Sequence, residues 1–327
     1  MGSPTRAGRS ASDRATSDDI VWCYQMLLGR EPETAGQRDY EALIDQGGIT
    51  REQLVGYFFS SPEFRERLVH SFEWTEGVPV EIAVGDLTYH VSPSDTTVGA
   101  ELRTMGEYEP HVTAAIRRYL REGQCFADVG ASFGYFATLA GSIVGPGGSV
   151  FAFEPGPQNQ PLLLLNLYKN DIATSGVHHM ALSDSAGLVL YSDSGGNGFI
   201  GPFTGDPMDL ATHTLVRVST LDHEVGNHQV DMMKIDVEGA EGLVIRGGDA
   251  LLRRCHPTLI FEFTPAALPA ISGITGEALL SNLVDLGYSL DVVTSGSDDR
   301  RAHGVDEIMA RYEAAEVQHL DLMAWVD

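Results

Sequence analysis

The fold of this chain is decided by the stretch FADVGASFGY, residues 126–135. It begins as an apolar strand, reaches an acid at Asp128 and turns through glycines into a segment with helical spacing. An acid followed by a glycine-rich turn between a strand and a helix is typical of a nucleotide-binding α/β domain. The sequence therefore predicts a ligand site at the end of this strand.

Strand and helix patterns alternate around this stretch from residue 111 onward. Strands are predicted at 124–129, 149–153, 177–182, 230–236, 257–263, 288–294 and 318–325, and helices at 111–121, 134–143, 157–170, 240–252 and 275–286. Such alternation predicts an α/β fold with a mostly parallel sheet and helices on both faces. The ligand is expected beyond the carboxyl ends of the strands, near the first one.

The glycine turn discriminates between two kinds of nucleotide ligand. A dinucleotide site needs the pattern GxGxxG, whose second glycine lets the backbone approach a pyrophosphate. Ser132 occupies that position, between Gly130 and Gly134, and the carboxylate of Asp128 would face the phosphates. A nucleotide-dependent oxidoreductase is therefore disfavoured. S-adenosylmethionine suits the turn better, because it carries an ammonium and a sulfonium and no phosphate.

Further candidate residues stand at the ends of the later predicted strands. Glu154 ends the second, where a carboxylate can accept both ribose hydroxyls, and Ala181 lies in the third, beside the expected adenine. Asp236 and Glu238 end the fourth, and Glu262 lies in the fifth. Two roles are open for these acids. Asp236 or Glu238 takes the proton of an acceptor hydroxyl, or Asp236 and Glu262 jointly hold Mg²⁺.

The segment 193–214 is rich in glycine and proline and too long for an ordinary connection. We therefore predict an irregular loop that lines the acceptor site, with an apolar wall formed by Phe199, Phe203 and Met208. His213, near the end of this segment, is a second candidate for the catalytic base. The alternative is that His213 is a solvated histidine without a catalytic role.

The first 72 residues form a separate part of the chain. Residues 1–17 are predicted to be a disordered leader, and residues 18–72 a bundle of four short helices, with a capping box between Thr50 and Gln53. The bundle resembles a small helical domain of unknown function and is expected to serve in docking or homo-oligomerisation, or as a stabilising cap. A β-hairpin at 78–91 then opens the second domain, 73–327, whose Rossmann-like core is predicted at 107–327.

Composition limits the partners of the chain. The formal net charge of −25 repels nucleic acids and anionic membranes, so the expected partner is a small-molecule acceptor. Three cysteines, Cys23, Cys125 and Cys255, lie far apart without a zinc-binding or disulfide pattern. No run is apolar enough for a membrane span or a signal peptide, and a cytoplasmic protein is therefore expected.

Five short motifs, taken in order, resemble the FkbM-type methyltransferase family. They are DVGA (128–131), FEP (153–155), ALSD (181–184), TLD (220–222) and KIDVEGAE (234–241). The resemblance covers roughly residues 98–325. It implies a class I methyltransferase fold and methyl transfer from S-adenosylmethionine, usually to a hydroxyl of a natural product or a sugar.

The same resemblance extends to the segment GEYEP, residues 106–110, and implies that Glu109 contacts the cofactor near its methionine end. The predicted cofactor contacts are then Glu109, Asp128, Gly130, Ser132, Gly134, Glu154, Ala181 and Asp236. The alternative function is that of a non-catalytic cofactor-binding or scaffold protein that acts through its N-terminal helices.

Overall fold

The computed structural model describes residues 14–28, 30–61, 63, 78–93, 95–96, 98–172, 174, 176–194, 197–203, 213–294, 300–315 and 317–326. The chain divides into two compact units, residues 1–77 and 78–327, which are described separately. No helix in the described ranges is long and apolar enough to cross a membrane.

The N-terminal unit contains helices α1 (Ser17–Leu28), α2 (Thr34–Gly47) and α3 (Arg51–Ser60). The predicted capping box is confirmed, because the Thr50 hydroxyl accepts the backbone N–H of Gln53 and the Gln53 side chain accepts that of Thr50. Most of the predicted fourth helix, 61–70, lies outside the described residues.

Residues 1–13 of the predicted leader also lie outside the described residues. Directly after them, Arg14 forms an isolated β-bridge with Thr50, so the end of this segment is ordered against the start of α3. Three rings form the centre of the unit: Tyr24 meets Phe58 edge to face, and Tyr40 stacks on Phe58 at 4.4 Å between ring centroids. Aromatic packing therefore holds these short helices together.

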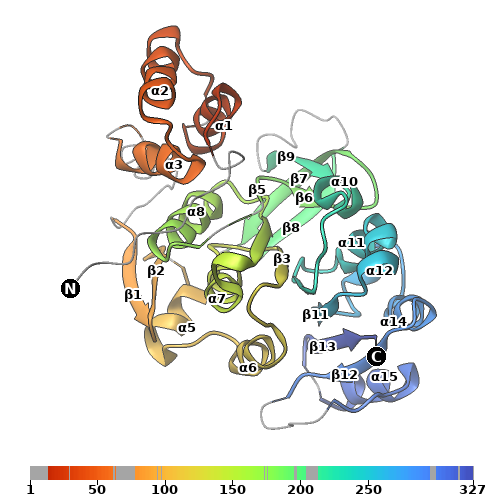
Figure 1. Cartoon of the computed structure of the whole chain (residues 1–327). Helices are drawn as coiled ribbons and strands as arrows, with labels where there is room; N and C mark the ends of the chain where they lie inside the picture. Colours follow the sequence, from red (N-terminus) through yellow and green to blue (C-terminus); the bar gives the residue numbers. More distant parts are fainter. Residues whose placement is uncertain are drawn as a thin grey trace. The chain divides into compact units, whose positions relative to one another are not determined.

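The second unit contains most of the strands and helices, in the order that the sequence predicts for an α/β domain (Figure 1). Its strands are β1 (Val80–Val84), β2 (Leu87–Val91), β3 (Cys125–Val129), β4 (Ser149–Phe153), β5 (Gly176–His178), β6 (Ala181–Leu182), β7 (Gly187–Ser194), β8 (Asn197–Pro202), β9 (Thr214–Ser219), β10 (Met232–Ile235), β11 (Thr258–Phe263), β12 (Ser289–Val292) and β13 (Leu320–Trp325). Its helices are α5 (Val98–Met105), α6 (Pro110–Tyr119), α7 (Tyr135–Val144), α8 (Asn159–Lys169), α10 (Leu221–Val225), α11 (Glu241–Gly247), α12 (Asp249–Cys255), α13 (Leu268–Ile271), α14 (Gly276–Asp285) and α15 (Val305–Ala315).

The main sheet has the strand order β12-β13-β11-β10-β3-β4-β5. The five strands from β11 to β5 are parallel, and β13 runs antiparallel to both β11 and β12. Strand order reverses between β3 and β10, because β4 and β5 extend the sheet on one side of β3 and β10 and β11 on the other. A reversal of this kind opens a crevice at the carboxyl ends of the strands, where ligands bind in open α/β sheets.

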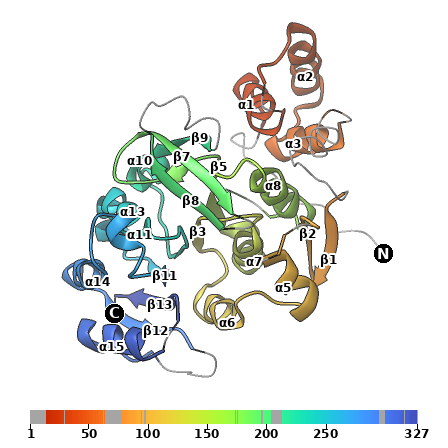
Figure 2. The same ribbon diagram turned by 180° about the vertical axis from the view of Figure 1, so that it is seen from behind.

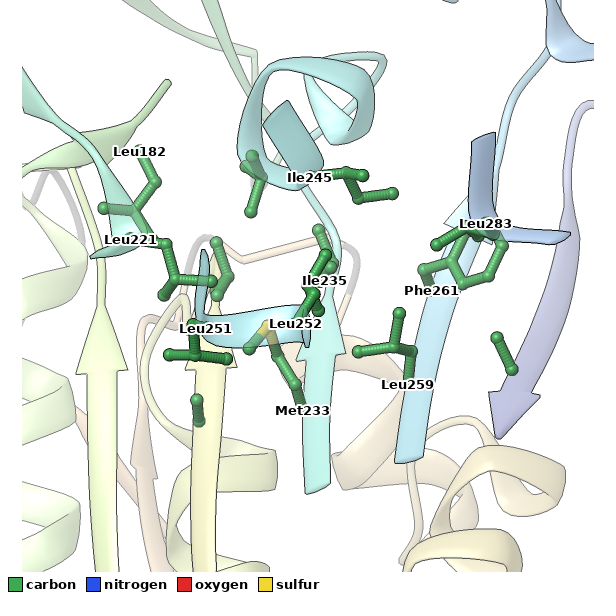
Figure 3. Close-up of a cluster of buried hydrophobic side chains, with 14 of the residues drawn as sticks. Leu182, Leu221, Met233, Ile235, Ile245, Leu251, Leu252, Leu259, Phe261 and Leu283 are labelled. Carbon is green, nitrogen blue, oxygen red and sulfur yellow. The ribbon is translucent and has the colours of Figure 1, made fainter. Parts of the chain in front are cut away.

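Alternate residues of the central strands face two layers of helices, and the two views of the ribbon show these layers on opposite sides of the sheet (Figures 1 and 2). Helix α7 covers β3 and β4 on one face. On the other face Met233, Ile235, Leu259 and Phe261 pack with side chains of α11, α12 and α14 (Figure 3). The prediction of a mostly parallel sheet between two helical layers is therefore confirmed.

Two predicted elements are each divided into two in the structure. The predicted strand 177–182 is two short strands, β5 in the main sheet and β6 in a second sheet of order β6-β9-β7-β8. The predicted helix 240–252 is two helices, because α11 ends at Gly247 and α12 begins at Asp249, with Gly248 between them. Glycine is a poor helix former, and the pair Gly247-Gly248 marks the break. Gly247 also packs closely on a neighbouring loop, since a Cβ there would stand 2.0 Å from the Ser183 carbonyl oxygen.

The prediction of an irregular loop at 193–214 was wrong for its first part. Residues 197–202 form β8, which pairs antiparallel with β7. The glycine at position 198 is compatible with a strand because the ring of Tyr191 occupies the space of its side chain: a Cβ there would lie 2.2 Å from the Tyr191 hydroxyl. Residues 204–212, including Met208, lie outside the described residues.

Candidate active site

A cavity of about 250 Å³ lies at the carboxyl ends of β3, β4, β10 and β11, where the strand order reverses. Eight of the residues predicted from the sequence line it: Glu109, Gly130, Ser132, Glu154, Ala181, Asp236, Glu238 and Glu262. They come from six separate parts of the chain, which the fold brings together at this cavity. Tyr191, Gly198 and Ile200 add a wall from the second sheet.

Three predicted residues lie elsewhere. Asp128 is 1% exposed and lies outside the described lining of the cavity, with burial raising its pKa to about 7. Gly134 caps the start of α7 and packs on Leu163. His213 is exposed and is also absent from the described lining. Of the apolar residues predicted for the acceptor wall, Phe203 is 38% exposed.

The turn after β3 is held by its neighbours on both sides. The backbone N–H groups of Gly130 and Ala131 both donate to the Phe153 carbonyl at the end of β4. Gly130 has φ +85°, and a Cβ there would lie 1.8 Å from the carbonyl oxygen of Asp236. Glycine is therefore required at position 130 for backbone packing against the end of β10, as well as for its left-handed conformation.

Glu154 is buried, and each of its carboxylate oxygens accepts a hydrogen bond from a backbone N–H group. Its Oε2 accepts the N–H of Ser132 at 2.7 Å, and its Oε1 accepts the N–H of Gly156 at 2.7 Å. Burial raises the pKa of Glu154 to about 7, and these hydrogen bonds limit the rise. Oε1 also accepts a long hydrogen bond from Asn159 Nδ2 at 3.4 Å, so the remaining acceptor capacity of Glu154 toward a ligand lies mainly on Oε2.

A buried ion pair lies at the centre of the site. Lys234 is 4% exposed, its Nζ lies 2.6 Å from Asp236 Oδ2, and Glu109 Oε2 lies 3.8 Å away. Burial alone would lower the pKa of Lys234, but the carboxylates of Asp236 and Glu109 raise it well above its ordinary value. Lys234 also lies 4.5 Å from the centre of the Phe136 ring, a cation–π distance. Its positive charge offsets part of the effect of burial, which raises the pKa of Glu109.

Two further carboxyl groups, those of Glu238 and Glu262, lie close to Asp236. Ligand atoms of Asp236, Glu238 and Glu262 lie within 4.8 Å of one another. Burial and the charge of Asp236 raise the pKa of Glu238 to about 7, and burial with Asp236 and Glu238 raises that of Glu262 to about 9. The loop that carries Glu238 is fixed by Glu241, whose Oε1 accepts the N–H groups of Val237 and Gly239. The site therefore concentrates carboxyl groups, two of which keep their protons to a higher pH than usual.

Backbone strain is concentrated at the same place. Glu109, Ser132 and Glu238 have φ of 40°, 50° and 53°, in the left-handed region that residues other than glycine rarely adopt. All three line the cavity. Strained conformations of this kind persist where the surrounding structure enforces them and are frequent at binding and catalytic sites.

Among the other residues of the cavity, Tyr108, Tyr191, Lys234 and His319 were not singled out from the sequence. Tyr108 directly precedes Glu109, and Lys234 lies two residues before Asp236. Their closeness in the sequence to these predicted acids could have identified them as site residues. Tyr191 and His319 lie at elements whose place in the fold the chain order does not reveal. His319 directly precedes β13, and antiparallel pairing of β13 with β11 brings it beside Glu262.

The strand order and a ligand cavity at its reversal define a Rossmann-like domain of the class I methyltransferase type. Residues 128–290 match the family described as the Methyltransferase FkbM domain, and this chain belongs to that family. Residues 1–68 match a domain of unknown function, DUF4214.

The chain is 31% identical to the 31-O-demethyl-FK506 methyltransferase FkbM of Streptomyces tacrolimicus, in an alignment that covers 39% of this chain and 60% of that protein. Among solved structures, a methyltransferase FkbM from Methylobacillus flagellatus is 14% identical with a TM-score of 0.38, covering 90% of this chain and 72% of the other. An S-adenosylmethionine-dependent O-methyltransferase from Thermotoga maritima is 15% identical with a TM-score of 0.38, covering 77% and 79%.

Proposed function

We propose that this protein is an S-adenosylmethionine-dependent O-methyltransferase whose acceptor is a hydroxyl of a natural product or of a sugar-containing small molecule. The observation that carries the proposal is the meeting of the turn after β3 with Glu154 and Glu109 in one cavity of an FkbM-family domain.

Cysteine chemistry agrees with a cytoplasmic setting, because Cys23, Cys125 and Cys255 are free thiols.

The donors and acceptors of the cavity fit this cofactor. Glu154 offers oriented carboxylate oxygens for ribose hydroxyls, and Met180, Ala181 and Leu182 offer an apolar surface for adenine. Glu109 Oε2 is buried and has no hydrogen-bond partner among the described residues, so an ammonium group would satisfy it. The cofactor supplies an electrophilic methyl group on a sulfonium, and the surrounding carboxylates favour that positive charge.

An acceptor hydroxyl is supported by the relative from Streptomyces tacrolimicus, which is named for 31-O-demethyl-FK506. The protein's main contribution is alignment of the nucleophile with the methyl group, since a sulfonium is already a good leaving group. Tyr191, Ile200 and His319 line the same cavity and are therefore candidates to contact the acceptor.

Mg²⁺ is a second element of the proposal. Carboxylate oxygens are the ligands that Mg²⁺ prefers, and Asp236, Glu238 and Glu262 supply three in one place. The hydrogen bond from Lys234 to Asp236 competes with an ion there, so Glu238 and Glu262 would provide most of the coordination. A chelator decides the matter: lost turnover with unchanged cofactor affinity supports the metal, and full turnover in excess EDTA rejects it.

The decisive assay uses the full chain, methyl-labelled S-adenosylmethionine and two hydroxyl acceptors, 31-O-demethyl-FK506 and methyl glucoside. We expect label on the oxygen of one acceptor, identified by mass spectrometric fragmentation. Label on nitrogen in amine-bearing analogues and none on oxygen would contradict the proposed O-methylation. Cofactor binding without transfer to either acceptor or analogue would favour the scaffold function instead.

A further inference from the structure

The carbonyl group of Phe133, in the turn after β3, is held by a side chain from another element. Phe133 lines the cavity, and the hydrogen-bond ladder of α7 begins one residue later, at the Gly134 carbonyl. The Phe133 carbonyl instead accepts a hydrogen bond from the side-chain Nδ2 of Asn166, on α8, at 2.8 Å. Asn166 is fully buried. A buried amide needs partners for its two N–H groups and its oxygen, so the other contacts of Asn166 are informative.

These other contacts are on strand β2. Asn166 Oδ1 accepts the backbone N–H of His90 at 2.6 Å, and its Nδ2 donates to the His90 carbonyl at 3.0 Å. Asn170, the C-cap residue of α8, makes the same pair of bonds with Thr88, at 2.9 and 2.7 Å. Two amide side chains of α8 thus bind the outer edge of β2 in the sheet that it forms with β1, and both ribbon views show α8 beside β2 (Figures 1 and 2).

The spacing of the two asparagines matches the spacing of the backbone groups that they bind. Four residues of an α-helix rise about 6 Å, and two residues of an antiparallel strand span about 7 Å. Asn166 and Asn170 are four residues apart on one face of the helix, and Thr88 and His90 are two residues apart on the strand. The β1–β2 hairpin is therefore attached to α8 by hydrogen bonds with a defined register.

Asn166 differs from Asn170 because only Asn166 also reaches the turn after β3. The second N–H of Asn170 donates to the Asn166 carbonyl, at 2.7 Å. In the turn, Ser132 has φ of 50°, in the left-handed region. Its N–H is held by Glu154 Oε2, and the carbonyl of the next residue is held by Asn166. Such a conformation persists where the surrounding structure enforces it, and these two buried side chains do so.

We propose that Asn166 is a positioning residue for S-adenosylmethionine and that it couples occupancy of the cofactor site to the β1–β2 hairpin; this rests on the proposed function. The amide that fixes the Phe133 carbonyl also fixes both backbone groups of His90. A ligand that restrains the turn therefore restrains β2 through Asn166. Because such coupling is reciprocal, the contact of Asn166 with His90 in turn favours the conformation of the turn that binds the cofactor.

A matched pair of variants separates positioning from stability. Asn166→Leu and Asn170→Leu both keep a side chain of similar size and both remove two hydrogen bonds to β2, but only Asn166→Leu releases the Phe133 carbonyl. Calorimetry with S-adenosylhomocysteine should show at least tenfold weaker binding for folded Asn166→Leu. The affinity of Asn170→Leu should stay within twofold of wild type, because His90 keeps its bonds to Asn166. Equal affinities in the two variants would overturn the proposal.

Amide hydrogen exchange of the full-length wild-type chain tests the coupling without any variant. Saturating S-adenosylhomocysteine should slow exchange in β2, residues 87–91, and leave exchange unchanged in β12, residues 289–292, at the far edge of the main sheet. In Asn166→Leu at saturating ligand, the slowing in β2 should disappear. Unchanged exchange of β2 in ligand-saturated wild type would contradict the coupling. Failure of the wild-type chain to bind S-adenosylhomocysteine would instead contradict the proposed function.

Discussion

The backbone N–H of Ser132 donates to Oε2 of Glu154 at 2.7 Å and thereby ties the turn after β3 to the end of β4. A dinucleotide site has glycine at the position of Ser132, so that a pyrophosphate can use the backbone there. Here a side-chain carboxylate already uses that donor. The same contact orients Glu154 and leaves this N–H unavailable to a phosphate. The geometry of the turn therefore bears directly on which cofactor the cavity can bind.

Replacement of Gly130 by alanine should destabilise the fold more than replacement of Gly123. Both glycines have positive φ, +85° and +80°, but a Cβ at 130 meets the Asp236 carbonyl oxygen at 1.8 Å, and one at 123 meets nothing within 4 Å. Gly123→Ala should lower the free energy of unfolding by about 1–2 kcal/mol, because alanine is strained at this positive φ. Gly130→Ala should cost about 1–3 kcal/mol more because of overpacking, in chemical denaturation. Equal costs would show that the turn can move away from β10.

Lys234→Met should destabilise the protein by about 3–5 kcal/mol, because it leaves the partly buried Asp236 and Glu109 without their buried cation. Lys169→Met, at the exposed end of α8, serves as the control and should change the free energy of unfolding by less than about 0.5 kcal/mol. Denaturant titration of both variants provides the measurement. A Lys234→Met protein as stable as the control would mean that the ion pair makes no net contribution.

Stability should fall as the pH rises, in part because of Glu262. Its pKa is about 9 in the folded chain against 4.5 as its ordinary value, so the folded state binds more protons between these values and loses stability as the pH rises through them. The free energy of unfolding of the unliganded protein should therefore decrease from pH 5.5 to pH 8.5. Glu262→Gln should reduce this decrease, whereas the exposed Glu313→Gln should leave it unchanged. If Glu262→Gln shows the same pH dependence as wild type, the raised pKa of Glu262 is not a cause of the loss of stability.

The sheet and much of the site edge could be predicted because strands β3, β4, β10 and β11 end in recognisable acids. The period and flanking turns of these strands are local properties of the sequence. Placement of Asp128 could not be predicted in the same way. It stands at the strand end like Glu154, yet strand alternation puts its side chain under α7, where it accepts a hydrogen bond from the Ala137 backbone. Which face a terminal residue takes depends on a one-residue register that periodicity does not fix.

Other differences arise from contacts between distant segments. Gly247 at the end of α11 packs against the backbone of Ser183, and Gly198 of β8 packs against the ring of Tyr191 on β7. Helix α15 and strand β9 were not predicted, although Val305, Ile308, Met309 and Tyr312 of α15 recur at helical spacing. His319 became a site residue only through the pairing of β13 with β11. Long-range contacts of this kind have no local signature in one sequence.

The central claim is that the cavity between Ser132, Glu154 and Glu109 holds S-adenosylmethionine, and isothermal titration calorimetry of the full chain tests it most directly. Wild type should bind S-adenosylmethionine at one site and show no binding of NAD. Glu154→Ala should weaken that affinity at least tenfold, about 1.4 kcal/mol, while the exposed Glu122→Ala keeps the wild-type value. An unchanged affinity in Glu154→Ala, with the fold intact, would contradict the assignment of this cavity as the cofactor site.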